Sequence, residues 1–276
     1  MPRILRFARR SHAPLQDNES HAFAARHSLS IYRSQSIYTF IPKNGCTTLR
    51  YSLALENGCI RGAEDFEWIH RNNWSFSAAL AELLTARSTF VVLRCPYARL
   101  ASFYLDKVVR GVPPATSLLP LLPLLPALVG LEALTFRQLA AATVDPAFRK
   151  SNNHVRDQID FLVYEDYDAY FCLERFAEAS VEIKRMTGLE VVDARLLSGH
   201  GLDKLSLDQS RCYADVPAGE IAAMKASGRA PDPAALFDAA VRDMVDLAYG
   251  EDVAFYERLF GESNLGCKLR SKAVEL

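Results

Sequence analysis

The chain has 276 residues, and 32 Lys and Arg against 33 Asp and Glu leave a formal net charge of −1. Half of the residues are hydrophobic and 24% are charged, which is typical of a globular protein and excludes a disordered chain, a collagen-like fibre and a polybasic nucleic-acid-binding tail. Because the charges balance, nothing attracts nucleic acid over the whole surface, and any anion-binding site must be local.

Residues 1–34 show no regular pattern, and we expect an irregular segment there, a single domain at 35–262 and a C-terminal tail at 263–276. The first residues carry four arginines but lack the apolar core, about 7–15 residues long, of a secretory signal. The six cysteines are scattered and form no C-x-x-C pair, so we predict neither a zinc ribbon nor a redox pair, and no metal site.

The first predicted strand is Ser-Ile-Tyr-Thr-Phe-Ile at 36–41, which alternates and is rich in β-branched and aromatic residues. Pro42 ends this strand, and the polar turn Lys-Asn-Gly-Cys-Thr-Thr follows at 43–48. Leucines at helical spacing come next, and Gly58 follows them where helices commonly end. The order is therefore strand, polar glycine-containing turn, helix.

A second strand–turn–helix unit follows. The apolar run Thr-Phe-Val-Val-Leu at 89–93 is typical of a strand buried on both faces of a parallel sheet, and a helix is predicted over 97–109. Two such units, separated by helical segments, predict an α/β fold with a central parallel sheet flanked by helices. Further downstream we expect a short strand at 170–173 and helices at 134–143, 177–186, 217–225 and 233–260.

The segment 111–131 contains no charged residue and has about the length of a membrane span. Five prolines interrupt it, and interior prolines break helices, so a spanning helix is disfavoured. We expect the stretch from Leu118 to Leu125 to form an apolar loop packed on the domain. The alternative is a surface that contacts a membrane or a partner.

Both predicted turns are suited to anion binding, because ligands of parallel α/β sheets bind beyond the carboxyl ends of the strands. A helix start with a turn of backbone N–H groups binds phosphate or sulfate, and basic and hydroxyl side chains strengthen such a site. The candidate anion-binding residues are Lys43, Asn44, Gly45, Cys46, Thr47, Thr48, Arg94, Arg99 and Ser102.

Two motifs carry a family resemblance. Ile-Pro-Lys-Asn-Gly-Cys-Thr-Thr-Leu-Arg at 41–50 closely resembles the 5′-phosphosulfate loop of carbohydrate sulfotransferases, in which P-K-x-G-C-T is typical. Residues 92–107 resemble the 3′-phosphate motif of these enzymes, R-D-P-x-x-R-x-x-S-x-Y-x-x-K. The chain departs from that motif at Cys95, where the family usually has Asp; we expect this change to affect the rigidity of the turn rather than donor binding.

Two further blocks support the resemblance. Residues 153–158 with 170–174 are similar to the family's H-W-x-x-Q segment and its later aromatic strand, and 249–256 are similar to its terminal Y-x-x-D-x-x-x-Y helix. The resemblance covers 36–260. It implies a P-loop-like three-layer α/β fold, the donor 3′-phosphoadenosine-5′-phosphosulfate (PAPS) and the product PAP, without a metal ion.

The resemblance also implies residue roles. Lys43 would contact the bridging and 5′-phosphate oxygens of PAPS, and residues 45–48 would surround the phosphosulfate. Arg94 and Ser102 would hold the 3′-phosphate. Sulfuryl transfer from PAPS to an acceptor hydroxyl, the reaction that the resemblance implies, also needs a general base, and histidine is the natural residue near neutral pH.

Two histidines are candidates for the base. His70 lies between the two donor motifs, where related sulfotransferases commonly have their base, and His154 lies in the third block. Glu67, or no base at all, are the alternatives. The predicted catalytic residues are therefore Lys43, His70 and His154.

We accordingly expect an enzyme that sulfates a hydroxyl of a carbohydrate or glycolipid. One alternative is a kinase with a divergent P-loop, which the absence of the Walker A pattern G-x-x-x-x-G-K-[ST] disfavours. Another is a non-catalytic PAP-binding scaffold. Because neither a secretory signal nor an anchor is recognisable, we expect a cytoplasmic location, with peripheral membrane contact as the alternative. We expect no nucleic-acid partner.

Overall fold

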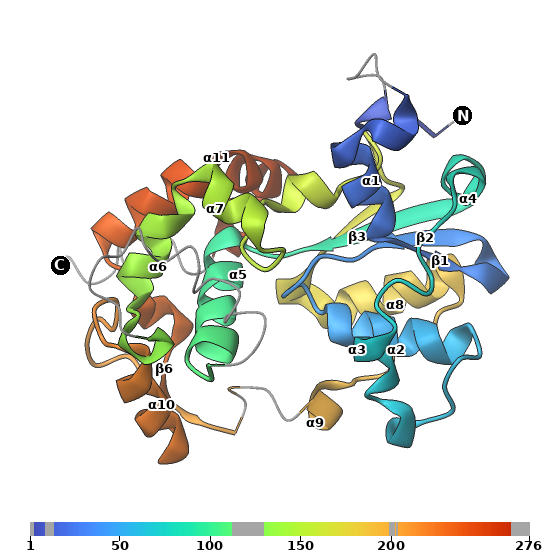
Figure 1. Cartoon of the computed structure of the whole chain (residues 1–276). Coiled ribbons are helices and arrows are strands. Elements are labelled where there is room, and N and C mark those ends of the chain that lie inside the picture. Colours follow the sequence, from blue (N-terminus) through green and yellow to red (C-terminus); the bar gives the residue numbers. More distant parts are fainter. Residues whose placement is uncertain (1–2, 9–13, 112–129, 199–201, 203, 266–276) are drawn as a thin grey trace. The chain divides into compact units, whose positions relative to one another are not determined.

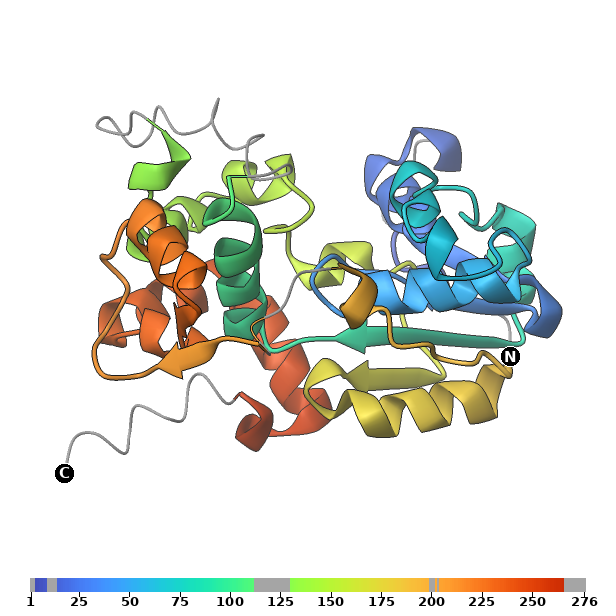
Figure 2. The ribbon, with the colours of Figure 1, turned by 90° about the horizontal axis from the view of Figure 1, so that it is seen from below.

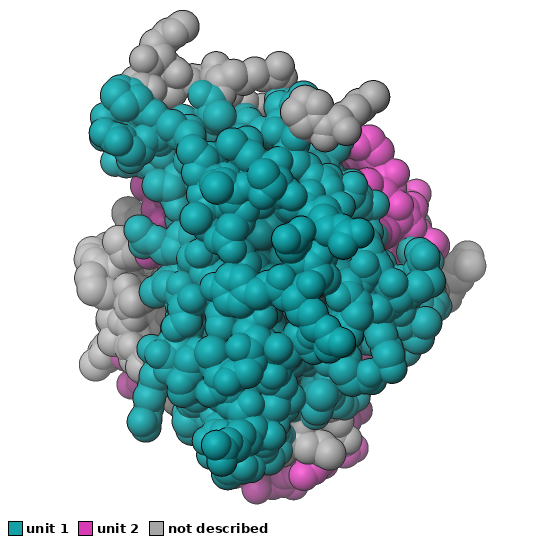
Figure 3. Space-filling view, turned by 90° about the vertical axis from the view of Figure 1, so that its right-hand side faces the viewer, with its two compact units in different colours: residues 1–93, 158–199 teal, residues 94–157, 200–276 magenta. Residues whose placement is uncertain are grey.

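The computed structural model describes residues 3–8, 14–111, 130–198, 202 and 204–265 (Figure 1). The chain divides into two compact units, which Figure 3 shows in different colours. Unit 1 consists of residues 1–93 and 158–199, and unit 2 of residues 94–157 and 200–276. The loop predicted from Leu118 to Leu125 lies outside the described residues.

Unit 1 contains a four-stranded sheet in the order β1 (Ser28–Ile31), β2 (Ser36–Thr39), β3 (Ser88–Leu93), β4 (Ala169–Cys172). β1 is antiparallel to β2, whereas β2, β3 and β4 are parallel and run side by side (Figure 2). The carboxyl ends of these three strands therefore share one edge of the sheet. The predicted α/β fold with a central sheet flanked by helices is confirmed, but the sheet is mostly parallel rather than entirely so, because β1 is antiparallel.

Helices cover both faces of this sheet (Figure 1). On one face, alternate strand residues such as Tyr38, Phe90 and Val92 share a buried cluster with α2 (Cys46–Glu56) and α8 (Phe176–Thr187). On the other, α1 (Glu19–Arg26) packs on β1 and on η8 (Gln158–Phe161). The remaining elements of unit 1 are η2 (Leu15–Asp17), η3 (Tyr32–Ser34), η4 (Ala63–Asp65), α3 (Trp68–Arg71), α4 (Leu80–Thr85), η9 (Leu173–Arg175) and α9 (Arg195–Ser198).

The segment 1–34 was predicted to be irregular, but α1 and β1 lie within it, so that prediction was wrong for this part. α1 begins after Asn18, whose side chain accepts a hydrogen bond from the His21 N–H at 2.9 Å. β1 was not predicted. Its sequence is Ser-Leu-Ser-Ile, and all four residues are buried although two of them are polar. Ser28 contacts α1 directly, because its hydroxyl donates to the Ala24 carbonyl at 3.0 Å.

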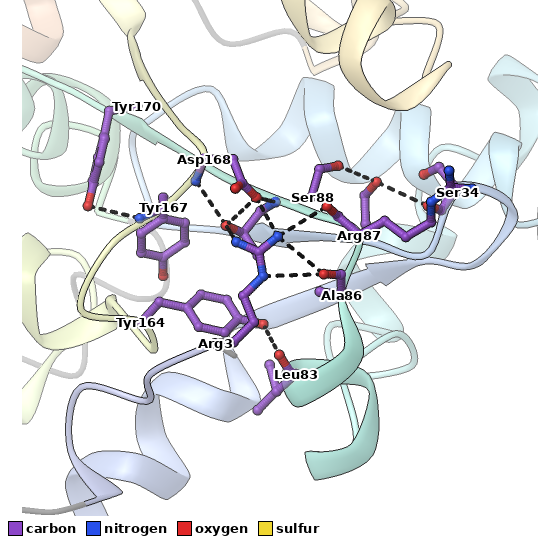
Figure 4. A network of polar contacts seen from close by, with 12 residues as sticks. Arg3, Ser34, Leu83, Ala86, Arg87, Ser88, Tyr164, Tyr167, Asp168 and Tyr170 are labelled. Carbon is purple, nitrogen blue, oxygen red and sulfur yellow. Dashed lines mark hydrogen bonds and ion pairs between the residues drawn. The ribbon is translucent and has the colours of Figure 1, made fainter. Parts of the chain in front are cut away.

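Arg3 holds the amino-terminal edge of the same sheet together (Figure 4). Its guanidinium donates to the Ala86 carbonyl at 3.2 Å and the Arg87 carbonyl at 3.1 Å, and it pairs with Asp168 at 2.7 Å. Since Arg87 precedes β3 and Asp168 precedes β4, Arg3 connects the starts of both strands. Burial by itself would raise the pKa of Asp168, yet hydrogen bonds from Arg3 and Thr89 lower it.

Unit 2 is mainly helical. α11 (Ala239–Phe260) packs against α5 (Pro96–Phe103) and α6 (Phe136–Thr143). A π-helical turn, η5 (Tyr104–Val108), continues α5. The other elements of unit 2 are η7 (Leu131–Ala133), α7 (Pro146–Ser151), β5 (Ser206–Asp208), α10 (Ala218–Ala226), β6 (Arg229–Pro231), η10 (Pro233–Leu236) and η11 (Glu262–Asn264). Within the described parts of the chain, no helix is both long and apolar enough to cross a membrane.

The helix predicted at 233–260 is two elements. η10 ends at Leu236, and Asp238 is the extended N-cap of α11, with its side chain accepting from the Val241 N–H at 2.9 Å. An N-cap has non-helical backbone angles, so the chain turns at this point instead of continuing as one helix. The parallel pair of short strands β5 and β6 was not predicted at all.

Candidate functional site

The donor loop, residues 42–45, connects β2 to α2 at the carboxyl edge of the sheet of unit 1. Lys43 and Gly45 both have φ 72°, in the left-handed region. Among the described non-glycine residues, φ is positive at Lys43 and Gln35. This conformation costs a residue with a Cβ about 1–2 kcal/mol, so the surrounding structure must hold Lys43 in it.

Position 45 favours glycine for two reasons. The positive φ disfavours other residues, and a Cβ atom there would lie 2.9 Å from Cδ1 of Leu173 and 3.6 Å from the Phe176 ring. Leu173 follows β4 and Phe176 begins α8. The donor loop therefore packs closely against the segment that connects β4 to α8.

The start of α2 is suited to an anion. Its N-cap Gly45 provides no side-chain cap, and the helix is 11 residues long. The Leu49 N–H donates back to the Gly45 carbonyl at 3.2 Å, whereas the first-turn amides of residues 46–48 have no acceptor within the helix by geometry. Such amides, together with the helix dipole, bind phosphate or sulfate groups.

Asn44 is fully buried, although its two neighbours in the loop are not. Its Nδ2 donates to the Val92 carbonyl at 3.0 Å and to Oε1 of Gln158 at 2.6 Å. Its backbone N–H donates to the Ile41 carbonyl at 3.2 Å. Asn44 therefore connects the loop to β3 and η8, and the donor contact predicted for it stays a prediction.

Arg50 is a buried cation of α2. It is the last residue of the motif at 41–50, and the motif predicts no role for it. It donates to the Ile69 carbonyl in α3, and its guanidinium lies 5.3 Å from the centre of the Phe40 ring. Burial lowers the pKa of Arg50 and raises that of Tyr38, and both groups interact electrostatically with Cys46. The sequence does not show that Arg50 is buried, because arginines on helices usually face solvent. Without that information, nothing distinguished it from a surface residue.

His70 lies on α3, the short helix to which Arg50 is bonded. Its side chain is exposed, and its ring lies edge-on to Phe66 with 5.4 Å between the ring centroids. Because the ring is exposed, an acceptor hydroxyl can reach it, as a general base requires. Unit 1 thus contains the donor loop and one of the two predicted bases.

Unit 2 begins at Arg94, directly after the last residue of β3. Cys95 is the N-cap of α5 and makes no side-chain cap hydrogen bond, and Pro96 occupies the first helical position. Asp, the usual family residue, is a favoured N-cap, so its replacement by Cys95 removes a capping interaction. Ser102 is half-buried on the same helix.

Arg99 is 3% exposed, and two of its N–H groups are used within unit 2. Nη1 donates to the Arg156 carbonyl at 2.6 Å, and Nη2 donates to the Asn153 carbonyl at 3.1 Å. Burial lowers the pKa of Arg99, while Tyr249 and Asp252 oppose that effect. These contacts favour a role in holding the chain around His154; contact with the donor stays a prediction.

The turn at 152–157, which we name the His154 turn, is held by hydrogen bonds within the turn and from distant side chains. The His154 N–H donates to Oδ1 of Asn152 at 2.9 Å, and the Tyr249 hydroxyl donates to the Val155 carbonyl at 2.6 Å. The His154 ring is tilted against Phe103, with 5.7 Å between the centroids. With the two bonds from Arg99, three carbonyls of this turn accept hydrogen bonds from distant side chains.

Tyr249 reaches the turn from a kink in α11, where its own backbone angles are φ −119° and ψ 27°. Burial raises the pKa of Tyr249, so the hydroxyl remains a donor at neutral pH. Asp252, one turn further along α11, is 2% exposed. Residues 153–157 of one supporting block and Tyr249 of the other therefore meet in unit 2, which gives a physical reason for the joint occurrence of the two blocks.

The predicted site residues are thus divided between the two units. Unit 1 contains Lys43, Asn44, Gly45, Cys46, Thr47, Thr48 and His70, and unit 2 contains Arg94, Arg99, Ser102 and His154. Within the described ranges, no group of three or more His, Cys, Asp or Glu side chains is arranged to hold a metal ion.

A comparison with protein families matches residues 29–195 to the model described as "Sulfotransferase family". The match includes the donor loop, α5, both candidate histidines and the His154 turn. Searches of curated proteins and of solved structures found no match. Since the family model covers more than half of the 276 residues, the chain belongs to the sulfotransferase family, whose enzymes are PAPS-dependent.

Proposed function

We propose that this sulfotransferase transfers a sulfuryl group from PAPS to a hydroxyl of a carbohydrate or glycoconjugate. The observation that carries the proposal is the donor loop: a lysine in a strained conformation, followed by an uncapped helix start at the carboxyl edge of a parallel sheet. The P-loop-like three-layer architecture belongs to the same proposal, and helices on both faces of the sheet support it.

The proposed reaction is an in-line displacement. The acceptor oxygen forms a bond to sulfur while the bond between sulfur and the 5′-phosphate oxygen breaks, and the proton of the hydroxyl passes to a base. Negative charge then develops on the 5′-phosphate of PAP. Lys43 and the first-turn amides of α2 stabilise that charge, and positioning supplies the rest of the catalysis.

Arg94 and Ser102 are the proposed ligands of the 3′-phosphate. A guanidinium binds phosphate oxygens in a bidentate fashion, and a hydroxyl adds one donor. Arg94 directly follows β3, and Ser102 lies on the helix that begins after it. Their spacing follows the family motif, which supports the assignment.

Two residues remain candidates for the base. His70 is supported by its exposed ring on a helix that is bonded to α2. His154 is supported by the hydrogen bonds that hold its turn. Replacing each by Gln and measuring the pH dependence of kcat distinguishes them, since the loss of the base removes the acidic limb of the profile.

A transfer assay tests the proposal directly. The full chain is incubated with ³⁵S-labelled PAPS and a panel of glycans, with and without a chelator, and PAP and ATP binding are measured by calorimetry. Label in a glycan with chelator present, together with PAP binding, is the expected result. Binding of ATP but not of PAP would overturn the proposal in favour of a kinase, and PAP binding without transfer to any glycan or other hydroxyl acceptor would favour a non-catalytic scaffold.

A further inference from the structure

We propose that the side chains of Asn44 and Gln158 form a latch that holds Lys43 in the conformation required for donor binding. This inference rests on the proposed function, because it gives Asn44 a positioning role within the donor site. The role differs from direct contact with PAPS: Asn44 acts on the donor through the backbone of its neighbour Lys43.

The contacts of Asn44 define the latch. One nitrogen, Nδ2, donates to Oε1 of Gln158 at 2.6 Å and to the Val92 carbonyl at 3.0 Å. Gln158 is 2% exposed and Val92 is fully buried, so both bonds lie in the interior of unit 1. A buried hydrogen bond is directional and has no competition from water. The bonds therefore set both the position and the orientation of the peptide at Asn44.

Lys43 needs such support. Its left-handed conformation is unfavourable for a residue with a side chain, and an unsupported loop would relax towards the common regions. Asn44 is the next residue, so fixing its peptide restricts ψ of Lys43 and, with Gly45, the path of the whole loop. Loss of the latch should therefore redirect the Lys43 side chain and the amides that follow it.

A second observation argues against a purely stabilising role. Oδ1 of Asn44 is buried, and none of the described residues forms a hydrogen bond to it. Leaving a buried acceptor without a partner is unfavourable, so an amide at this position is a poor choice for stability alone. The position is explained if the donor group of the amide is needed to orient the loop.

Asn57 provides a matched control. It lies at the opposite end of the same helix, α2, where it is the C-cap. Its side chain also makes two hydrogen bonds: Nδ2 donates to the Ser30 carbonyl at 2.9 Å, and Oδ1 accepts from the Tyr32 N–H at 3.2 Å. Asn57→Ala thus removes an asparagine with the same number of bonds, 13 positions further along the chain.

The experiment combines PAP binding with hydrogen–deuterium exchange on the full-length chain. We expect Asn44→Ala to weaken PAP binding about 10-fold and Gln158→Met about 5-fold, because each removes a buried hydrogen bond. The double variant should bind no more weakly than Asn44→Ala, since both changes remove the same bond. Hydrogen–deuterium exchange over residues 41–48 should become faster in each latch variant. Asn57→Ala should change neither PAP affinity nor exchange over residues 41–48.

The outcomes separate the latch from the proposed function. If the wild-type chain binds no PAP, the proposed function fails, whereas faster exchange confined to the latch variants still supports the latch. Unchanged exchange over 41–48, or additive losses in the double variant, would overturn it. Equal losses of PAP affinity in Asn44→Ala and Asn57→Ala would also overturn it, by showing a general effect of stability. Gln158→Met, which leaves the Val92 bond intact, keeps the test valid should Asn44→Ala fail to fold.

Discussion

The donor loop in unit 1 and the His154 turn in unit 2 are held in place by different chemistry. In the donor loop a neutral amide, Asn44, donates to two acceptors while the adjacent Lys43 is left-handed. In the His154 turn, a guanidinium and a phenol from Arg99 and Tyr249 bond three backbone carbonyls. The first-turn amides that follow the loop have no acceptor within α2, whereas three carbonyls of the turn accept hydrogen bonds from protein side chains.

This difference indicates different tasks. A loop that binds a mobile anionic donor must present N–H groups, so its own support comes from a side chain that points inward. A turn that carries a candidate base must keep one backbone path, so side chains bond its carbonyls from outside. In both cases directional hydrogen bonds do what apolar contacts alone cannot, because apolar packing does not set the orientation of a peptide.

The largest expected effect tests the donor loop. Lys43→Ala removes the cation that we propose stabilises the developing charge, and we expect kcat to fall about 10²- to 10³-fold, as for the loss of other charge-stabilising donors. The transfer assay measures it, with Lys184→Ala as the control, because Lys184 is an exposed lysine of α8 paired with Glu190. Turnover unchanged by Lys43→Ala would refute the assignment of the loop.

The next effect tests the His154 turn. Arg99→Ala removes the guanidinium hydrogen bonds to two partly buried carbonyls, and we expect a loss of about 3 kcal/mol in the free energy of unfolding in urea. Arg99→Lys keeps the charge but not the geometry to reach both carbonyls, so it should recover only part of the stability. If either variant lost PAP affinity at unchanged stability, Arg99 would be a donor ligand, and the comparison would fail.

A smaller effect isolates one bond of the turn. Tyr249→Phe removes the hydroxyl that donates to Val155 and keeps the ring, and we expect a loss of about 1 kcal/mol in unfolding free energy. If His154 is the base, kcat should also decrease and the pH profile should shift, while PAP affinity stays the same. An effect on PAP affinity alone would assign this part of α11 to the donor instead.

The smallest effect comes from a region outside both turns. Asp168 pairs with Arg3 at the opposite edge of the sheet, and its lowered pKa means that the carboxylate contributes stability above its unfolded pKa of about 3.9. That contribution disappears as the pH falls through the lower pKa of the folded state. Because the pair is partly exposed, Asp168→Asn should cost about 1 kcal/mol or less at pH 7.

The measurement for Asp168→Asn is the free energy of unfolding against pH. The difference from wild type should shrink as the pH is lowered below about 4. PAP affinity and transfer should remain unchanged, because Arg3 and Asp168 lie at the amino-terminal edge of the strands. A difference that grows towards acid pH would contradict the direction of the pKa shift.

Local patterns in the sequence predicted the units that carry the candidate site. The alternation before Pro42 and the apolar run before Arg94 predicted β2 and β3, and both are present with their helices. Gly188 marks the end of α8 with φ 75°, as a glycine after a helical pattern suggests. These signals are reliable because strand alternation, helix periodicity and glycine at a helix end depend on neighbouring residues only.

Features that depend on distant residues could not be predicted from local sequence patterns. In β1, both serines are buried and Ser28 donates to α1, and the break before α11 depends on the cap formed by Asp238. Arg50 reads as a surface residue of a helix, and only its contact with α3 shows that it is buried.

The sequence by itself determined the family, the donor motifs and the strand–turn–helix order, because each is written in residues that are adjacent along the chain. Tertiary structure alone decided which groups Asn44 and Arg99 contact. Asn44 meets Gln158 across 114 positions, and Arg99 meets the His154 turn across 54 and 57 positions. Whether a polar side chain faces a ligand or supports a neighbouring turn depends on which distant groups the fold brings within hydrogen-bonding distance, and no local pattern records that choice.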